Sequence, residues 1–336
     1  MEPILRTALA TGKPVVTANK ALLAANLDQL GVLAQRTATP LYCEAAVAAA
    51  LPIIRHLSHR ADEIDSLWGI VNGTSNFVLT RLEQDEMSID AAVADAQSKG
   101  LAEADASADI DGQDAADKLS ILTYRAFGAW VRPTGFPVRG IRELTPADCD
   151  LAESMGCRIR LIARAARLNG ALDMAVEPML LPTWHLLASV EEEYNAVYLR
   201  CASSGDVSLF GMGAGAMPTA TAVLGDLIDL AQDNSVRWPE PRALPLARAG
   251  SAVEPAPRRH FLRVVAEPHP GLERRVESLV RRVGLMAQNR VARDDGDFHY
   301  LAFMISPSSD AKIAELMEAV SRLARVQKSL CLGVLE

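Results

Sequence analysis

Acidic side chains gather between Gly100 and Lys118, where the sequence reads GLAEADASADIDGQDAADK. Asp114 lies four residues before Lys118, so on a helix the two share one face and the carboxylate holds the ammonium group charged and aimed. Such a site could bind the ammonium group of an amino acid, while Lys118 donates a proton to a carbonyl oxygen. The alternative is a solvent-exposed acidic start of a helix, which the helix dipole favours. The acids before the lysine are Glu103, Asp105, Asp109, Asp111, Asp114 and Asp117.

A second polar group, TANK at Thr17 to Lys20, follows a short apolar stretch that predicts a buried strand. Ligands of open α/β sheets bind beyond the carboxyl ends of the strands, so Lys20 could reach a cofactor or a substrate there. The alternative is structural, because Asn19 is a preferred residue for capping a helix that begins at Lys20.

A third group, NGTSN at Asn72 to Asn76, stands between a predicted strand and a predicted helix. Small polar residues in such a turn let backbone N–H groups approach a ligand closely. The alternative is that Thr74 or Ser75 caps the helix, which uses the same exposed amide groups.

Two further segments carry weaker signals. GMGAGA at 211–216 fits G-x-G-x-x-A, but the surrounding βαβ unit and the later ribose-binding acid are not visible. We interpret it as a loop that could touch a cofactor, rather than as a dinucleotide fingerprint. In EAAVAAALP, at 44–52, a buried glutamate beside free backbone carbonyls could hold a cation. The alternative is the start of a helix next to the core.

The composition is that of a globular protein without nucleic-acid or membrane partners. The chain has 336 residues, 49% of them hydrophobic, and a formal net charge of −8. An acidic balance disfavours nucleic acid, which requires a basic face, and no apolar run approaches the roughly 20 residues of a membrane span. The N-terminal sequence lacks the pattern of a signal peptide. Five scattered cysteines without a CxxC pair indicate reduced, buried thiols in a cytoplasmic protein.

The first 52 residues predict a parallel α/β layer. Hydrophobic periodicity predicts helices at 3–11 and 20–35 and strands at 13–19 and 40–47. A nucleotide-binding unit of this kind begins with a strand and a Gly-rich turn, and neither precedes the helix at 3–11. We therefore expect an N-terminal truncation or a misassigned start, with a helix at 218–236 completing the layer.

Residues 53–217 predict an α+β domain that contains most of the polar groups above. Within it, an acidic loop is expected at 101–111, and Asn169-Gly170 predicts a tight hairpin turn. The expected helices are at 76–83, 88–99, 112–130 and 145–155, and the expected strands are at 64–71, 138–142, 158–167, 172–181, 195–201 and 207–210.

The rest of the chain predicts a linker and a small C-terminal domain. Five prolines and few large apolar residues fall within 237–257, which is typical of a linker. Residues 258–336 then alternate in the order βαββαβ, which predicts a ferredoxin-like unit.

In this order, the polar segments resemble homoserine dehydrogenase, and the resemblance covers nearly the whole chain. The last unit is similar to an ACT domain, with Pro270-Gly271 at its first strand–helix turn. The matching text is GKPVVTANKALLA (12–24), EAAVAAALPII (44–54), GIVNGTSNFVLT (69–80), AQSKGLAEADASADIDGQDAADKLSIL (96–122) and GMGAGAMPTATAV (211–223).

The resemblance implies a fold and an activity. The fold would combine a partial Rossmann-type domain at 1–52 that lacks its first strands, an α+β catalytic and dimerisation domain at 53–217, and an ACT-like regulatory domain at 258–336. The family reduces L-aspartate 4-semialdehyde to L-homoserine with NADPH or NADH, in threonine and methionine biosynthesis. A homodimer and an amino-acid effector at the ACT-like domain are implied as well.

The resemblance also implies roles for single residues. Lys118 would donate the proton to the aldehyde oxygen, and Lys20 would lie near the nicotinamide and the substrate. This agrees with the chemistry, because hydride addition to a carbonyl builds alkoxide charge that an ammonium group stabilises. Glu103 and Asp114 would hold the substrate, and Gly100 and Gly213 would lie against the cofactor. The family's sodium site would fall on Glu44, Val47, Ala49 and Leu51.

The chain departs from the family pattern in two places. The Gly-rich turn that binds the pyrophosphate is absent, so we expect this chain to bind NAD(P) weakly or not at all. Alanines stand at 48–50, where the family usually has glycines, and they would be strained if the backbone there needs a positive φ. The alternative function is a non-catalytic truncated paralogue that binds an amino acid or dimerises.

Overall fold

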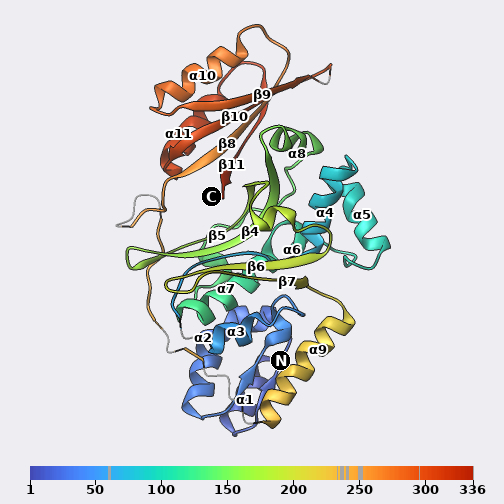
Figure 1. The fold of residues 1–336 in the computed structure, drawn as a ribbon, viewed down its shortest axis with the longest axis vertical. Coiled ribbons are helices and arrows are strands. Elements are labelled where there is room, and N and C mark those ends of the chain that lie inside the picture. Colours follow the sequence, from blue (N-terminus) through green and yellow to red (C-terminus); the bar gives the residue numbers. More distant parts are fainter. Residues whose placement is uncertain are drawn as a thin grey trace.

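The computed structural model describes residues 1–59, 62–232, 234, 238–239, 242–248, 253–294 and 296–335. Figure 1 shows three regions one above another: a small helical layer that holds the N-terminus, a central region of long strands, and a C-terminal unit. Helix α9 (Ala216–Ala231) returns from the central region to lie in the N-terminal layer. Among the described residues, no helix is long and apolar enough to cross a membrane.

The N-terminal layer has the predicted helix–strand–helix–strand order. It consists of α1 (Glu2–Ala10), β1 (Val15–Val16), α2 (Lys20–Arg36) and β2 (Leu41–Tyr42), and the two short strands pair in parallel. Asn19 begins α2 by accepting a hydrogen bond from the backbone N–H of Leu22 at 3.1 Å, as its residue type predicts. The carboxyl ends of β1 and β2 therefore open next to Lys20.

The strand predicted at 40–47 is wrong beyond Tyr42. The chain turns into a short 3₁₀ helix, η1 (Glu44–Ala46), because Glu44 is engaged from two sides. Its backbone N–H donates to Asp226 Oδ2 on α9 at 3.0 Å, and its carboxylate accepts from the start of α3 (Ile53–His59). The helix predicted at 218–236 is α9, and residues 233, 235 and 236 of that prediction lie outside the described residues.

The central strands and those of the C-terminal unit form one sheet. Among the described residues its order is β7-β6-β3-β4-β5-β11-β8-β10-β9, antiparallel except where β11 meets β5. Asn169 and Gly170 both have positive φ, which confirms the tight turn predicted between β4 and β5. The central strands are β3 (Ile64–Ile70), β4 (Cys157–Leu168), β5 (Ala171–Pro182), β6 (Tyr194–Cys201) and β7 (Gly205–Met212).

Helix α7 (Gln113–Phe127) is buried almost all round. It ends where Gly128 adopts a left-handed conformation, as C-terminal glycines commonly do. The acidic loop predicted at 101–111 contains a short helix, α6 (Ser107–Ile110). The other helices of the central region are α4 (Gly73–Gln84), α5 (Ile89–Ser98), η2 (Pro133–Gly135), α8 (Pro146–Glu153) and η3 (Leu186–Ser189).

The strand predicted at 138–142 does not form. Only Val138 makes an isolated bridge, to Val176 of β5. The next residues cross over α6, since Ile141 N donates to Ile110 O at 2.8 Å and a Cβ on Gly140 would overlap the Ile110–Asp111 backbone. Ile141 is therefore buried by packing against the end of a helix and not within a strand ladder.

The C-terminal unit has the predicted βαββαβ order and its own apolar core. A buried ion pair joins it to the central region, with Arg263 Nε 2.6 Å from Asp148 Oδ1. Of the predicted linker, residues 237, 240, 241 and 249–252 lie outside the described residues, and Ala247 N donates to Leu172 O at 2.8 Å. The elements are β8 (Arg258–Ala266), α10 (Leu272–Arg282), β9 (Ala287–Asp294), β10 (His299–Ser308), α11 (Asp310–Ser321) and β11 (Val326–Val334).

The five cysteines are all buried and none forms a disulfide, as predicted. Burial raises the pKa of the Cys149 and Cys331 thiols to about 12, so these thiols stay protonated.

Candidate active site

Helix α7 places Asp114 and Lys118 on one face, and both are buried. Asp114 Oδ2 lies 2.7 Å from Lys118 Nζ, and the two residues are 4% and 7% exposed. Lys118 Nζ also donates to Val71 O at 2.6 Å, just beyond the end of β3. The alternative of a solvated helix start is therefore wrong at these two positions. With two of its three N–H donors engaged, the ammonium group keeps one for a further partner.

Lys20, at the start of α2, completes this group from the N-terminal layer. Its ammonium group contacts Asp114 Oδ1, so one carboxylate binds two lysines, and its side chain remains 44% exposed. Burial lowers the pKa of Lys20, but the carboxylates of Asp114, Asp109 and Asp117 together raise this pKa above its usual value. Lys20 is therefore a protonated cation that solvent or a ligand can reach.

Asn72 links the end of β3 to the acidic residues. Its side-chain Nδ2 donates to Asp109 Oδ1 at 2.6 Å and to Asp114 Oδ2 at 2.8 Å. Its Oδ1 accepts from Ser75 N at 2.7 Å and so caps α4. The predicted capping by Thr74 or Ser75 is wrong, because Thr74 Oγ1 donates to Leu101 O instead. Sequence reasoning missed the bridging roles of Asn72 and Asp109, although an asparagine before a helix was a usable signal.

The two carboxylates that Asn72 bridges have opposite pKa shifts. Burial raises the pKa of Asp109, and the hydrogen bond from Asn72 only partly offsets this. Burial also acts to raise the pKa of Asp114, but Lys118 and Lys20 outweigh it and hold this pKa far below its usual range. Asp114 is therefore a permanent anion that pairs with both lysines.

The structure does not bring Glu103 to this cluster. Its side chain is exposed, its backbone carbonyl accepts from Gln97 Nε2 at 3.1 Å, and its carboxylate makes no ion pair or hydrogen bond with the described residues. Nearby Gly100 has a φ of 71° at the end of α5 and borders open space, since a Cβ there would meet nothing within 4 Å.

Gly213 lies where the chain leaves β7 for α9. A Cβ at this position would overlap the side chain of Asn195 on β6, so the close approach requires glycine. Because β7 is antiparallel to its neighbour, the Gly-rich segment is not the phosphate-binding turn of a parallel βα unit. Its interpretation as a loop, and not as a dinucleotide fingerprint, is therefore consistent with the fold.

Glu44 is 4% exposed and serves as a helix cap. Its Oε1 and Oε2 accept from the backbone N–H groups of Ile54 and Arg55, each at 2.8 Å, at the start of α3. Burial nevertheless raises the pKa of Glu44 to about 7. Among the described residues, no group of three histidine, cysteine or acidic side chains is arranged to hold a metal ion.

The segment after Glu44 carries backbone strain. Ala48 and Ala49 have φ values of 53° and 28°, a region that L-residues with a Cβ rarely adopt. Val47 is fully buried, and Leu51 O accepts from Ile53 N at 2.7 Å. The positive φ expected for this segment is thus present on alanine.

Comparison with known proteins places this chain in a family. A family model described as homoserine dehydrogenase matches residues 52–228. The homoserine dehydrogenase of Mycobacterium leprae is 42% identical over 234 residues, which are 68% of this chain and 53% of that protein. That of Neisseria gonorrhoeae is 35% identical over 300 residues, which are 87% of this chain and 67% of that protein. The chain spans about half the length of curated relatives such as the mycobacterial enzyme.

Solved structures agree with the sequence relatives. A homoserine dehydrogenase from Thiobacillus denitrificans has a TM-score of 0.90 at 30% identity, covering 99% of this chain and 79% of that one. A hyperthermophilic archaeal homoserine dehydrogenase in complex with NADPH has a TM-score of 0.61 at 30% identity, covering 72% of this chain and 70% of that one. The chain therefore belongs to the homoserine dehydrogenase family.

Proposed function

We propose that this chain carries the catalytic residues of a homoserine dehydrogenase that interconverts L-homoserine and L-aspartate 4-semialdehyde. The observation that supports this most directly is the buried ammonium group of Lys118. Asp114 and the carbonyl of Val71 hold this ammonium group in place, and its third N–H donor stays available for the substrate. The family of the chain and the names of its relatives support the same reaction.

In the proposed mechanism Lys118 transfers the proton. In the direction of reduction, its Nζ donates a proton to the aldehyde oxygen as negative charge develops there. In oxidation the ammonium group first releases a proton to solvent, and the neutral amine then takes the hydroxyl proton. Asp114 and the carbonyl of Val71 keep Lys118 aimed. We propose that Asp114 and Asp109 hold the ammonium group of the substrate, with Glu103 contacting its amino-acid end from the exposed loop.

A nicotinamide cofactor, NADPH or NADH, supplies or accepts the hydride when bound. The residues that we propose to lie beside it are Lys20, Gly100 and Gly213. Lys20 stands half exposed at the carboxyl ends of β1 and β2, where ligands of parallel sheets bind, and Gly100 borders open space. Residues 17–19, which join β1 to α2, contain no glycine, so we assign no phosphate contacts there.

We also propose a sodium ion at the strained segment, held by Glu44 and by the main-chain oxygens of Val47, Ala49 and Leu51. Each carboxylate oxygen of Glu44 accepts one N–H and keeps a second lone pair. Sodium chloride should then raise the unfolding temperature above pH 7 relative to choline chloride at equal ionic strength. Equal unfolding temperatures in the two salts would exclude this site.

The broader proposals concern assembly and regulation. We propose a nucleotide-binding layer of residues 1–52 with α9, a catalytic and dimerisation domain at 53–217, and an ACT-like regulatory domain at 258–336. The chain would act as a homodimer in threonine and methionine biosynthesis, with an amino-acid effector at the ACT-like domain. Sedimentation of the purified chain tests the dimer.

The experiment that tests the function is a titration of NADPH and NADH into the purified chain with L-homoserine present, followed by an assay of homoserine oxidation. Because we expect NAD(P) to bind weakly, the cofactor is supplied at millimolar concentration. We then expect cofactor reduction with L-homoserine and none with L-2-aminobutyrate, which has the same carbon skeleton without the hydroxyl group. Homoserine binding without turnover at saturating NAD(P) would favour the non-catalytic alternative and contradict the proposal.

A further inference from the structure

A large cavity lies between the central strands and the C-terminal unit. Its volume is about 670 Å³, which is within the range of small-molecule sites. Its wall combines residues 134–139, β4, β5 and residues 246–248 with β8, α11 and β11, segments that are far apart in the sequence. None of the residues assigned above to the reaction lines it, so it is separate from the candidate active site.

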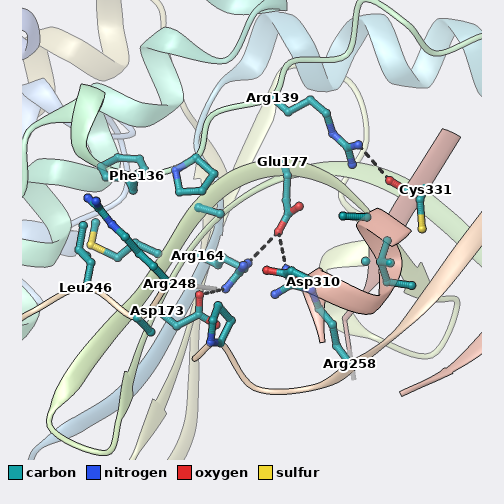
Figure 2. A pocket seen from close by; sticks show the side chains of 18 of the residues that line it. Phe136, Arg139, Arg164, Asp173, Glu177, Leu246, Arg248, Arg258, Asp310 and Cys331 are labelled. Carbon is teal, nitrogen blue, oxygen red and sulfur yellow. Dashed lines mark hydrogen bonds and ion pairs between the residues drawn. The ribbon is translucent and has the colours of Figure 1, made fainter. Parts of the chain in front are cut away.

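The carboxylates in this wall are all paired with arginines (Figure 2). Arg164 Nη1 lies 2.8 Å from Asp173 Oδ1, and its Nε lies 3.0 Å from Glu177 Oε1. Arg258 Nη2 lies 3.6 Å from the same Glu177 oxygen and 3.2 Å from Asp310 Oδ1. A cationic ligand would therefore have to displace an existing ion pair.

In the part of the chain that the structure describes, Arg139 of the same wall is bonded to a backbone carbonyl and not to a carboxylate. Arg139 Nη1 donates to the backbone carbonyl of Cys331 at 2.9 Å, and no carboxylate of the described residues lies within ion-pair distance of its guanidinium group. His260 adds no charge near neutral pH, because burial, with a smaller effect of Arg258, lowers its pKa to about 4. Arg139 thus lines the cavity without a carboxylate partner among the described residues.

The cavity also offers apolar surface. In Figure 2, Phe136 and Leu246 lie together at one side of the cavity, away from Arg139 and Cys331. Further apolar contacts come from α11 through Ile313, Ala314 and Met317. A ligand that fits has an anionic end and an aliphatic body, since burying an unpaired guanidinium is costly and burying hydrocarbon is favourable.

We propose that this cavity is a second binding site, which takes a small aliphatic carboxylate with its anionic group on Arg139 and its hydrocarbon chain on the wall of Phe136, Leu246 and α11. Such a ligand touches the central region and the C-terminal unit at once. Its binding therefore stabilises their contact, and this site is distinct from the substrate site of the proposed reaction.

Calorimetric titration with three probes of matched shape tests the proposal. These are 4-methylpentanoate, L-leucine, and 3-methylbutylamine, in which an ammonium group replaces the carboxylate of the first. We expect 4-methylpentanoate to bind roughly tenfold or more tightly than the amine, because only the carboxylate can form charge-assisted hydrogen bonds with Arg139. Comparison with L-leucine then distinguishes a simple carboxylic acid from an amino acid as the natural ligand.

Arg139→Gln should weaken 4-methylpentanoate binding by roughly tenfold or more. The matched control is Arg132→Gln, seven residues earlier, since Arg132 is exposed over the ring of Trp130 and does not line the cavity. Arg139 also donates to a backbone carbonyl, so Arg139→Gln could disturb the fold as well as the site. A second variant therefore leaves all the charges in place. Ala314→Trp fills the apolar side of the cavity from the surface of α11.

Ala314→Trp should abolish binding while the unfolding temperature stays close to that of the parent chain. Three results would overturn the proposal: no binding of either carboxylate at millimolar concentration, equal binding of the amine, or full binding by Ala314→Trp. If Arg139→Gln does not fold, the probes and Ala314→Trp still decide the outcome.

Discussion

Asp114 and Lys118 form a buried ion pair one turn apart on α7, with 2.7 Å between Oδ2 and Nζ. The same carboxylate contacts Lys20 on α2, so a single anion joins the central region to the N-terminal layer. A buried carboxylate is costly unless it is fully paired, and here two ammonium groups and the amide of Asn72 pair it. This arrangement holds two cations together at the site where we propose that the alkoxide forms.

Replacing Lys118 tests its proposed role as the proton donor. Lys118→Met keeps the shape of the aliphatic stem and removes the ammonium group, while Asp114 keeps Lys20 as a partner. We expect kcat for homoserine oxidation to fall by about 10²- to 10⁴-fold, the usual contribution of a positioned general acid or base. Steady-state kinetics with saturating cofactor measure it.

The matched control is Lys312→Met on the exposed face of α11, which should leave kcat unchanged. Circular dichroism and the unfolding temperature show whether Lys118→Met retains the fold. A folded Lys118→Met chain with the kcat of the parent would show that Lys118 is not the proton donor.

The reactivity of Lys20 reports the charge of Asp114. The acidic neighbours hold the pKa of Lys20 above its usual value, so little free amine is present near neutral pH and acylation is slow. In Asp114→Asn the pKa of Lys20 falls, and we expect its acetylation rate to rise several-fold, up to roughly tenfold for a shift of one pKa unit. Mass spectrometry of peptides after timed acetylation measures this rate.

Asp105→Asn is the control for that experiment, because Asp105 lies on the exposed loop, accepts a hydrogen bond from Ser107 N and, within the described residues, makes no hydrogen bond or ion pair with Lys20. In Asp105→Asn, Lys20 should be acetylated at the same rate as in the parent chain. An unchanged rate in Asp114→Asn would mean that the contact between Lys20 and Asp114 does not persist in solution.

Local sequence patterns correctly predicted the features that depend on residues close together in the chain. The i, i+4 spacing of Asp114 and Lys118, the cap at Asn19 and the turn at Asn169-Gly170 all appear as expected. The order of elements in the C-terminal unit also appears as predicted, because the alternation of strand and helix patterns is local, although β8 pairs with the distant strands β10 and β11.

The failures occur where a distant contact decides the conformation. Residues 138–142 have the composition of a strand, but Gly140 crosses the end of α6. Glu44 ends β2 early because it must cap α3 and bond to α9. The bridge from Asn72 to Asp109 and Asp114 joins residues about 40 positions apart, which no local pattern encodes.

Protonation of Glu44 should couple stability to pH. Burial raises its folded-state pKa to about 7, whereas in the unfolded chain it is about 4.3. The folded chain therefore binds this proton more tightly, and the resulting stability is complete below about pH 4.3 and is lost as the pH rises through about 7. This contribution is up to about 4 kcal/mol. Buried Asp226, whose pKa is raised to about 6 mainly by burial, acts in the same direction.

Glu44→Gln should flatten this dependence, because glutamine does not titrate. The measurement is the free energy of unfolding in urea at about pH 5 and about pH 7, for the parent and the variant. Glu153→Gln, an exposed position on α8, should keep the parental slope. A variant of Glu44 with the parental slope would mean that another group dominates this pH range.

Strain at Ala48 predicts an unusual response to glycine. Ala48 and Ala24 are both buried, at 2% and 1% exposure, so Ala→Gly removes a similar methyl contact at each. At Ala24, inside α2, glycine also costs about 1 kcal/mol in helix propensity. At Ala48, with a φ of 53°, it relieves roughly 1–2 kcal/mol of left-handed strain. We expect chemical denaturation to find Ala48→Gly more stable than Ala24→Gly by about 2 kcal/mol. Equal losses at the two positions would show that the backbone at Ala48 carries no such strain.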